Sequence, residues 1–211
     1  MNRLPVAERR EQLIEAALTV ASRDGIEAAT VRAVAAEAGV SLGVVHYCFQ
    51  DKDELLRAMA HAITEQNLAS SLGDLPEGAP LEAVLEGVVH ALWLGLRDHR
   101  NAQLLSYELT TTALRHAELT QVAVEQYEGQ WAAAEQVLEQ VERATGVGWS
   151  VPRAVLARTV IAVVDGFSLA WLVDGDDGAA LAGLQGFGRF LATLAEPAEL
   201  AAEPVAADVP A

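Results

Sequence analysis

Apolar residues recur at intervals of three and four along most of this chain, and short groups of Gly, Pro, Asp and Asn interrupt them. This spacing predicts amphipathic helices, because positions three and four apart fall on one face of a helix. Alternating apolar and polar runs, which would indicate strands, are absent from the sequence. The predicted helices cover residues 9–25, 31–38, 41–49, 52–71, 80–98, 101–114, 116–145, 152–174 and 177–195. The pattern therefore predicts an all-α protein of about nine helices.

Residues 25–55 contain the most informative local pattern, which is two short helices separated by a glycine turn. Thr30 is a good N-cap for the first of them. The apolar face of that helix consists of Val31, Val34, Ala35 and Ala38. Gly39 follows where a helix needs a left-handed residue, and Ser41 can cap the second helix with its hydroxyl group. The pattern predicts a helix-turn-helix, with an ordinary αα-hairpin as the alternative.

The second helix of this pair has an outer face that suits DNA. Val45 and Phe49 are four residues apart and are predicted to face inward, so the residues between them face outward. A helix-turn-helix places such a face in the major groove. There a glycine allows close approach, aliphatic groups contact thymine methyls, and polar groups donate to phosphates. The residues for these three roles are, in turn, Gly43, Leu42 with Val44, and His46 with Tyr47.

The stretch 30–55 and the preceding helix RREQLIEAALTVASRDG resemble the N-terminal domain of the TetR family of transcriptional regulators. In that family a serine-x-glycine recognition helix ends in aromatic residues and a phenylalanine, and a lysine-acidic-leucine start to the fourth helix follows. This chain departs from the pattern at His46, where the family usually has tyrosine, and at Cys48, whose thiol is a weak donor. The resemblance and the outward face together imply a DNA-binding set of Thr30, Arg32, Ser41, Leu42, Gly43, Val44, His46, Tyr47 and Lys52.

The net charge of the chain is unusual for a protein that binds DNA. Lys and Arg number 14 and Asp and Glu number 30, which gives −16. Residues 1–60 carry only −2, so 14 of the excess negative charges lie beyond them. Salt screens that acidic part over about 8 to 10 Å, whereas a few cations at the groove act locally. We expect few phosphate ion pairs, one of them from Lys52 at the start of a helix, with a solvated surface lysine as the alternative.

Length and turn signals divide the chain into three parts. Residues 1–51 are predicted to form a small DNA-binding module, and residues 52–195 are enough chain for a larger ligand-binding and dimerisation core. Residues 196–211 are rich in Pro, Ala and acid and lack an apolar period, which predicts a disordered tail. The loops of the larger part are predicted at 73–80, 98–101, 145–148 and 174–178.

The last two predicted helices carry apolar stripes that indicate a dimer interface. Two such helices from each chain can form a four-helix bundle with twofold symmetry, and the glycines at 183, 186 and 188 indicate a close approach of helices. The segment VIAVVDGFSLAWLVDGDD also resembles the C-terminal domain of BetI-like members of the family. The alternative is that both stripes belong to the core of one chain. The predicted interface residues are Val160, Val164, Asp165, Leu184, Gly188 and Leu191.

Aromatic residues at helical spacing in the larger part are candidates for lining an effector cavity. They are Trp93, Tyr107, Tyr127, Trp131, Phe167 and Trp171. Acidic residues in the same segments favour a hydrophobic organic effector that is cationic or neutral, since aromatic faces and carboxylates both attract positive charge. Each aromatic taken singly can instead be core. Asp165 lies inside an apolar run, and it can serve either the dimer or the ligand.

The sequence therefore predicts a TetR-type regulator, a repressor by preference, that binds a palindromic DNA operator as a homodimer and is released by a small organic effector. Alternatives are an activator, a ligand-insensitive regulator, and a helical binding protein or enzyme without DNA binding. Against an enzyme stands the lack of a nucleophile-base pair, a phosphate loop or metal-binding spacing, and no cofactor is expected. A single cysteine and the lack of a signal h-region or an uninterrupted membrane-length apolar run predict a cytoplasmic protein with no membrane partner.

Overall fold

The computed structural model describes residues 4–71 and 75–197. The chain packs into two compact units. The N-terminal unit consists of Met1–Leu68 and Leu96–Gln130, and the C-terminal unit consists of Ala69–Gly95 and Trp131–Ala211. The division of residues 1–51 from 52–195 by function stays a prediction.

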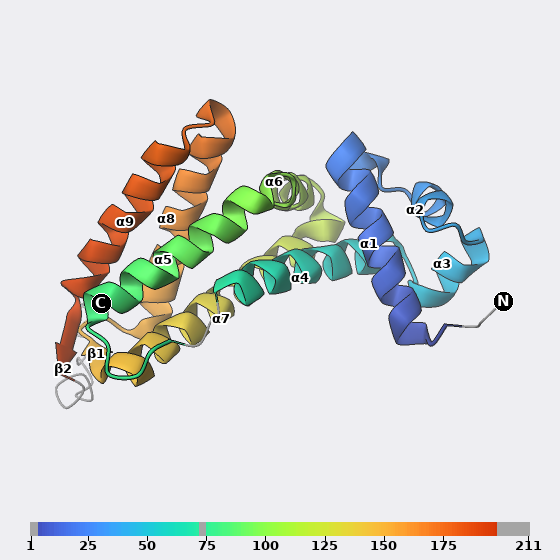
Figure 1. Cartoon of the computed structure of the whole chain (residues 1–211). Coiled ribbons are helices and arrows are strands. Elements are labelled where there is room, and N and C mark those ends of the chain that lie inside the picture. The colour runs from blue at the N-terminus through green and yellow to red at the C-terminus, as the bar shows by residue number, and fades with distance from the viewer. Residues whose placement is uncertain (1–3, 72–74, 198–211) are drawn as a thin grey trace, which may run out of the picture. The chain divides into compact units, whose positions relative to one another are not determined.

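The all-α prediction is confirmed, with nine α-helices in the described ranges (Figure 1). They are α1 (Val6–Asp24), α2 (Val31–Glu37), α3 (Leu42–Cys48), α4 (Lys52–Ser71), α5 (Leu81–Asp98), α6 (Arg100–Arg115), α7 (Thr120–Thr145), α8 (Arg153–Asp174) and α9 (Asp177–Ala192). Two short 3₁₀ turns, η1 (Ile26–Ala28) and η2 (Ala117–Leu119), precede α2 and α7.

A two-stranded antiparallel sheet was not predicted. Strand β1 (Val147–Trp149) pairs with β2 (Ala195–Pro197), with Val147 opposite Pro197. The predictions of a loop at 145–148 and of a helix to 195 were therefore wrong, and the first two residues of the predicted tail lie in a strand. Three-residue strands are too short to show a period of two, so their sequence carries no strand signal. Residues 198–211 of that tail lie outside the described residues.

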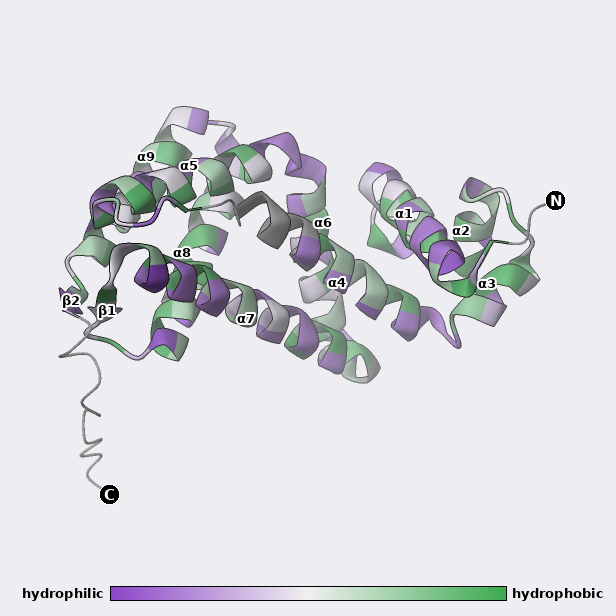
Figure 2. Cartoon of the chain, turned by 60° about the horizontal axis from the view of Figure 1, so that its bottom comes forward, coloured by the Kyte–Doolittle hydropathy of each residue, from purple (hydrophilic) through white to green (hydrophobic). Residues whose placement is uncertain are grey.

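The core of the N-terminal unit joins α1 to α4 with α6 and the first half of α7. Its fully buried side chains include Leu13, Val34, Val45 and Met59 from the first four helices and Leu109 from α6. Figure 2 shows hydrophilic and hydrophobic residues alternating along α1, whereas α3 is mostly hydrophobic. A helix as short as α3 depends on such packing for its stability, because isolated helices of this length do not form in water.

The C-terminal unit is built around the pair α8 and α9, which lie side by side (Figure 1). Trp93 and Trp171 pack edge to face with ring centres 5.2 Å apart. The predicted close approach of helices is confirmed at Gly183, where a Cβ atom would lie 2.1 Å from the Phe167 ring. It is also confirmed at Gly188, where a Cβ atom would lie 3.2 Å from Val89, but not at Gly186.

Helix α8 is apolar on most of its surface. Within the described residues it is the one helix long and apolar enough to cross a membrane by length and composition, with a mean hydropathy of 1.7. Arg158 and Asp165 lie along it, and buried helices of soluble proteins show the same composition. Only 22% of its apolar window is buried within the chain. A helix that is apolar on all sides is expected to be buried against other protein surface. The exposed apolar surface of α8 is therefore suited to contact with a partner.

Candidate functional site

The turn between α2 and α3 has the geometry that the sequence predicts. Thr30 caps α2, because its hydroxyl oxygen accepts a hydrogen bond from the Ala33 amide at 3.2 Å. Gly39 has φ of 65°, the left-handed conformation that a side chain would disfavour. The Val40 amide then donates to the Ala35 carbonyl at 2.9 Å and closes the end of α2. The predicted helix-turn-helix is confirmed.

Ser41 occupies the N-cap position of α3, but its hydroxyl group forms no capping bond. The Val44 amide, which such a hydroxyl normally satisfies, donates instead to the Ser41 carbonyl at 2.9 Å. The predicted capping role of the hydroxyl was therefore wrong. The exposed side chain of Ser41 remains available to an outside partner.

The outward face of α3 is open to solvent. Tyr47 is 70% exposed and Leu42 is 41% exposed, whereas Val45 is 1% exposed and packs in the core. His46 is exposed as well. A Cβ atom added at Gly43 would meet no protein atom closer than 4.0 Å, so the backbone itself is accessible at this point. The face offers a bare glycine between apolar and polar side chains, which is the arrangement that the DNA-binding prediction requires.

The start of α1 lies against this face, which the sequence did not reveal. A hollow of about 270 Å³ runs between the two helices, and it is lined by Leu4, Val6, Arg9, Gly43, Val44, Tyr47 and Cys48. Leu4 and Val6 are exposed apolar residues. Their only sequence signal was an apolar pair ahead of the first predicted helix. The beginning of α1 therefore belongs to the surface that α3 presents.

Two of the predicted DNA-binding cations are not engaged within the protein. Arg32 and Lys52 are exposed and form no ion pair with the described residues. Three other cations of this region are bound by carboxylates, in the pairs Arg10 with Glu54, Arg23 with Glu37 and Arg57 with Glu125. Lys52 is the first residue of α4, as predicted. Both unengaged cations can bind phosphate without breaking an internal contact.

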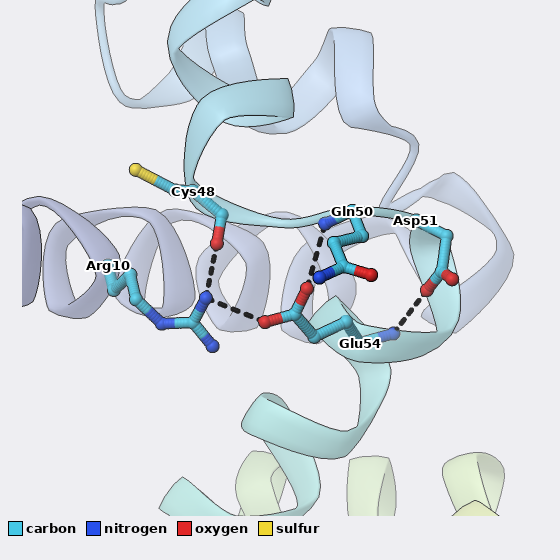
Figure 3. A network of polar contacts seen from close by, with 5 residues as sticks. All are labelled: Arg10, Cys48, Gln50, Asp51 and Glu54. Carbon is cyan, nitrogen blue, oxygen red and sulfur yellow. Dashed lines mark hydrogen bonds and ion pairs between the residues drawn. The ribbon is translucent and has the colours of Figure 1, made fainter.

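A polar network holds the end of α3 to α1 and α4 (Figure 3). The Arg10 guanidinium donates to the Cys48 carbonyl and, at 2.7 Å, to Glu54 Oε1, and its carbon atom lies 4.3 Å from the centre of the Phe49 ring. Figure 3 shows the guanidinium between these two acceptors, with the Cys48 thiol pointing away from them. Arg10 therefore fixes the direction in which the chain leaves α3. Sequence reasoning missed this role, because the two partners lie about forty residues away along the chain.

The same network begins α4. The Glu54 amide donates to Asp51 Oδ1 at 2.7 Å, and Glu54 Oε2 accepts a hydrogen bond from the Gln50 amide at 2.8 Å. This arrangement resembles a capping box. In a capping box, the side chain of the N-cap residue accepts a hydrogen bond from the amide of the third helical residue, and the side chain of that residue accepts one from an amide at the helix start. The Gln50 amide and the Arg10 guanidinium hold the pKa of Glu54 below its ordinary value.

We expect Glu54→Gln to destabilise the N-terminal unit by about 1 kcal/mol near neutral pH, the scale of a partly exposed ion pair. A carboxylate whose folded pKa is lowered stabilises the fold above its unfolded pKa, and that stabilisation is lost as pH falls through the folded pKa. The free energy of unfolding of the wild type should therefore fall as the pH is lowered, and that of Glu54→Gln should fall less. Urea unfolding at several pH values across the acid range measures both. Glu11→Gln, an exposed change on α1, is the control. Identical acid dependence in Glu54→Gln and wild type would show that the network does not carry this stability.

The six predicted effector-site aromatics do not gather in one unit. Tyr107 and Tyr127 belong to the N-terminal unit, and Trp93, Trp131, Phe167 and Trp171 belong to the C-terminal unit. Trp93, Phe167 and Trp171 pack into a core cluster with Leu184, as their alternative interpretation requires. Trp131 is half-buried, and the Arg158 guanidinium carbon lies 3.5 Å from its ring centre. Its indole face therefore already receives a cation.

Glu108 links α6 to the DNA-binding region inside the N-terminal unit. Its Oε2 atom accepts a hydrogen bond from the Ile26 amide at 3.3 Å, at the turn that follows α1. Ile26 is itself buried in the core of this unit. Sequence reasoning counted Glu108 only among the acids near the aromatics, since a contact across eighty residues has no local signal. The contact gives α6 a direct connection to the base of α1.

The predicted dimer residues fall into two groups. Leu184, Gly188 and Leu191 are buried against their own chain, so this part of the stripe is core and not a free face. Val160, Val164 and Asp165 are half-buried on α8. Another set of exposed, apolar positions forms a stripe on the helix pair, the outer stripe, which consists of Val155, Ala162, Gly166, Leu169 and Val173 on α8, with Ala182 and Phe190 on α9. The sequence missed it because α8 is apolar on both sides.

Comparisons with known proteins agree with this geometry. Residues 13–59 match the family model described as bacterial regulatory proteins, tetR family, and residues 79–195 match a tetracyclin repressor-like C-terminal domain. The chain is 31% identical over 179 residues to the nicotine-responsive transcriptional repressor HdnoR of Paenarthrobacter nicotinovorans, covering 83% of this chain and 89% of that protein. It is 38% identical over 85 residues to the transcriptional regulator BetI of Escherichia coli, covering 37% of this chain and 44% of BetI.

Solved structures show the same relationship. The multidrug binding protein EbrR complexed with ethidium is similar with a TM-score of 0.58 and 30% sequence identity, covering 84% of this chain and 97% of that one. With family models matching both of its parts and a relative similar over most of its length, the chain belongs to the TetR family of bacterial regulatory proteins.

Proposed function

We propose that this regulator is a repressor that binds a palindromic DNA operator as a homodimer and leaves it when a small organic effector binds. The observation that carries the proposal is the outward face of α3, where exposed Leu42 and Tyr47 flank the accessible backbone of Gly43. Members of this family are DNA-binding transcriptional regulators, and the relative HdnoR is named a repressor. The proposed role is therefore not catalytic, and its place is the cytoplasm, where the operator is.

A homodimer is proposed because one short recognition helix contacts only a few base pairs. Two copies related by a dyad and about 34 to 36 Å apart read two half-sites of a palindrome. The outer stripe supports this assembly, since Leu169 is 51% exposed and Val173 is 84% exposed on an apolar helix. Glycine and alanine within the stripe allow close packing of helices. The partner face thus lies beside Val160, Val164 and Asp165 and does not include the buried residues of α9.

The proposed effector is an organic molecule that is cationic or neutral. The excess of 14 negative charges beyond residue 60 favours cations over anions. The Trp131 ring already holds the Arg158 guanidinium at 3.5 Å, which supports the affinity of this indole for positive charge. Two relatives support a cationic or neutral organic effector, since HdnoR is named nicotine-responsive and EbrR was crystallised with ethidium.

The proposed route from effector to DNA runs through α6. An effector acts only if it prefers the conformation in which the recognition helices are misplaced. Because Glu108 accepts a hydrogen bond from the Ile26 amide, a shift of α6 would displace the turn at the end of α1. Arg10 on α1 in turn holds the end of α3. The contacts of one unit therefore connect α6 to the DNA-binding face.

We expect lipophilic cations, and not matched anions of the same hydrocarbon body, to release operator DNA and to change tryptophan emission. The Trp131→Ala variant should bind operator as the wild type does but respond less to these cations, because it lacks the aromatic face. The measurement is a titration of both probes against operator release and fluorescence. Release by anions alone, or a response indifferent to Trp131, would contradict both the charge preference and the role of this residue.

A further inference from the structure

A buried polar cluster joins α6 to α7 within the N-terminal unit. Gln126 on α7 donates to the Ser106 hydroxyl at 2.8 Å and accepts a hydrogen bond from the Thr110 hydroxyl at 3.1 Å. All three residues are buried. Polar groups in such a place are stable only when they are paired, and these three satisfy one another. The cluster marks the point where the two helices touch.

Two amide oxygens beside this cluster have no such partner. Gln103 Oε1 and Gln130 Oε1 are buried and accept no hydrogen bond from the described residues. The Gln103 side chain is held in place, because its Nε2 atom donates to the Tyr107 hydroxyl at 2.9 Å, and the residue is only 6% exposed. A buried acceptor without a donor destabilises the free protein, so these two oxygens require an explanation.

Both glutamines lie close along their helices to the contact between α6 and α7. Gln103 lies three residues before Ser106 on α6, and Gln130 lies four residues after Gln126 on α7. At 1.5 Å per residue, each is about one helical turn or less from the touching point. The side chain of Gln103 is directed along α6 by its bond to Tyr107. Both acceptors therefore belong to the part of α6 and α7 next to this contact, and neither accepts a hydrogen bond from the described residues.

We propose that Gln103 Oε1 and Gln130 Oε1 bind an N–H donor group of the effector, which is a primary or secondary ammonium. This inference rests on the proposed function and names the chemistry that its effector must present. Two acceptors need at least two hydrogens, which an ammonium group supplies, and hydrogen bonds from a charged donor are the stronger kind. Quaternary ammonium groups carry the charge but no hydrogen to donate.

The test separates hydrogen donation from charge. The full-length protein is titrated by calorimetry at neutral pH with 1-naphthylmethylammonium and with its N-trimethyl analogue, which has the same ring and charge. Gln103→Met and Gln130→Met each keep the length of the side chain and remove the acceptor. Gln121→Met, an exposed change on the same α7, is the matched control. Operator binding without probe is measured on every sample.

We expect each acceptor variant to bind the primary ammonium about tenfold or more weakly, while affinity for the trimethyl analogue changes little. The melting temperature of unliganded Gln130→Met should rise, because an unpaired buried acceptor is gone. Equal losses for both probes or wild-type affinity in both variants would overturn the inference. A fall in melting temperature with unchanged affinity would also overturn it, since a bridging water then satisfies the oxygens. These outcomes leave sequence-specific operator binding intact, whereas failure of the proposed function appears as its absence.

Discussion

The Gly43→Trp variant is expected to lose sequence-specific DNA binding while it remains folded and dimeric. A Cβ atom at this position meets no protein atom within 4 Å other than Ser41 Oγ at 4.0 Å, so the fold itself tolerates a side chain there. The indole either stands off α3 or fills the hollow lined by Val44 and Tyr47, and both positions cover the face that reads base edges. Each lost base contact costs about 1–3 kcal/mol, so separation of the whole face from the groove removes specificity.

The measurement is an electrophoretic shift with operator and with random DNA, together with circular dichroism and sedimentation. Gly87→Trp is the matched control, because Gly87 is also an exposed helical glycine with no protein atom within 4 Å of an added Cβ, and it lies on α5. The control should bind operator as the wild type does. An unchanged shift with Gly43→Trp would place the DNA-binding surface elsewhere.

Disruption of the outer stripe should produce a monomer. We expect Leu169→Glu combined with Val173→Glu to dissociate the dimer, because two carboxylates then face an apolar partner surface on α8. The α8 face carrying these residues is exposed in the single chain, so the change should not unfold it. Operator affinity should fall by about 100-fold or more, since the two half-sites are then bound separately.

Analytical ultracentrifugation and operator titration at equal protein concentration measure these two effects. Leu114→Glu is the control, since Leu114 is 62% exposed at the end of α6 and lies outside the outer stripe. It should leave both the dimer and operator affinity unchanged. A dimer that survives the double substitution would move the interface away from α8.

Local signals in the sequence were sufficient for the helix-turn-helix. Thr30 and Gly39 act on neighbouring residues, so their types alone predict where α2 begins and ends. Ser41 shows the limit of this reasoning. Its residue type predicts a capping hydroxyl, but the Val44 amide is used by the Ser41 carbonyl instead, and residue type cannot choose between these two acceptors.

Features that depend on distant contacts could not be predicted from periodicity. Leu184, Gly188 and Leu191 share one face of α9, as predicted. Periodicity does not reveal whether such a face packs against its own chain or against a partner, and here it is buried within its own chain. Helix α8 is apolar on both sides, so its exposed apolar face was identified only from the exposure of its residues. The contacts of Arg10 with Glu54 and of Glu108 with the Ile26 amide likewise join residues far apart in sequence.

The effector aromatics show the same limit in another form. Helical spacing predicted which aromatics share a face, yet Trp93 and Trp171 pack against each other in a core cluster. Trp131 differs from them, because a guanidinium covers its ring. The unpaired oxygens of Gln103 and Gln130 had no sequence signal, since glutamines on a helix are usually solvated.

The central claim is that two copies of α3 read a palindrome, and selection of bound fragments from a random DNA library with the purified protein tests it most directly. We expect an enriched motif with twofold symmetry, whose half-sites are centred about 10 base pairs or a multiple of one helical turn apart. Hydroxyl-radical footprints on the enriched fragments should protect both half-sites on one face of the duplex. Enrichment of no motif, or of a single unrepeated half-site at full affinity, would contradict the account.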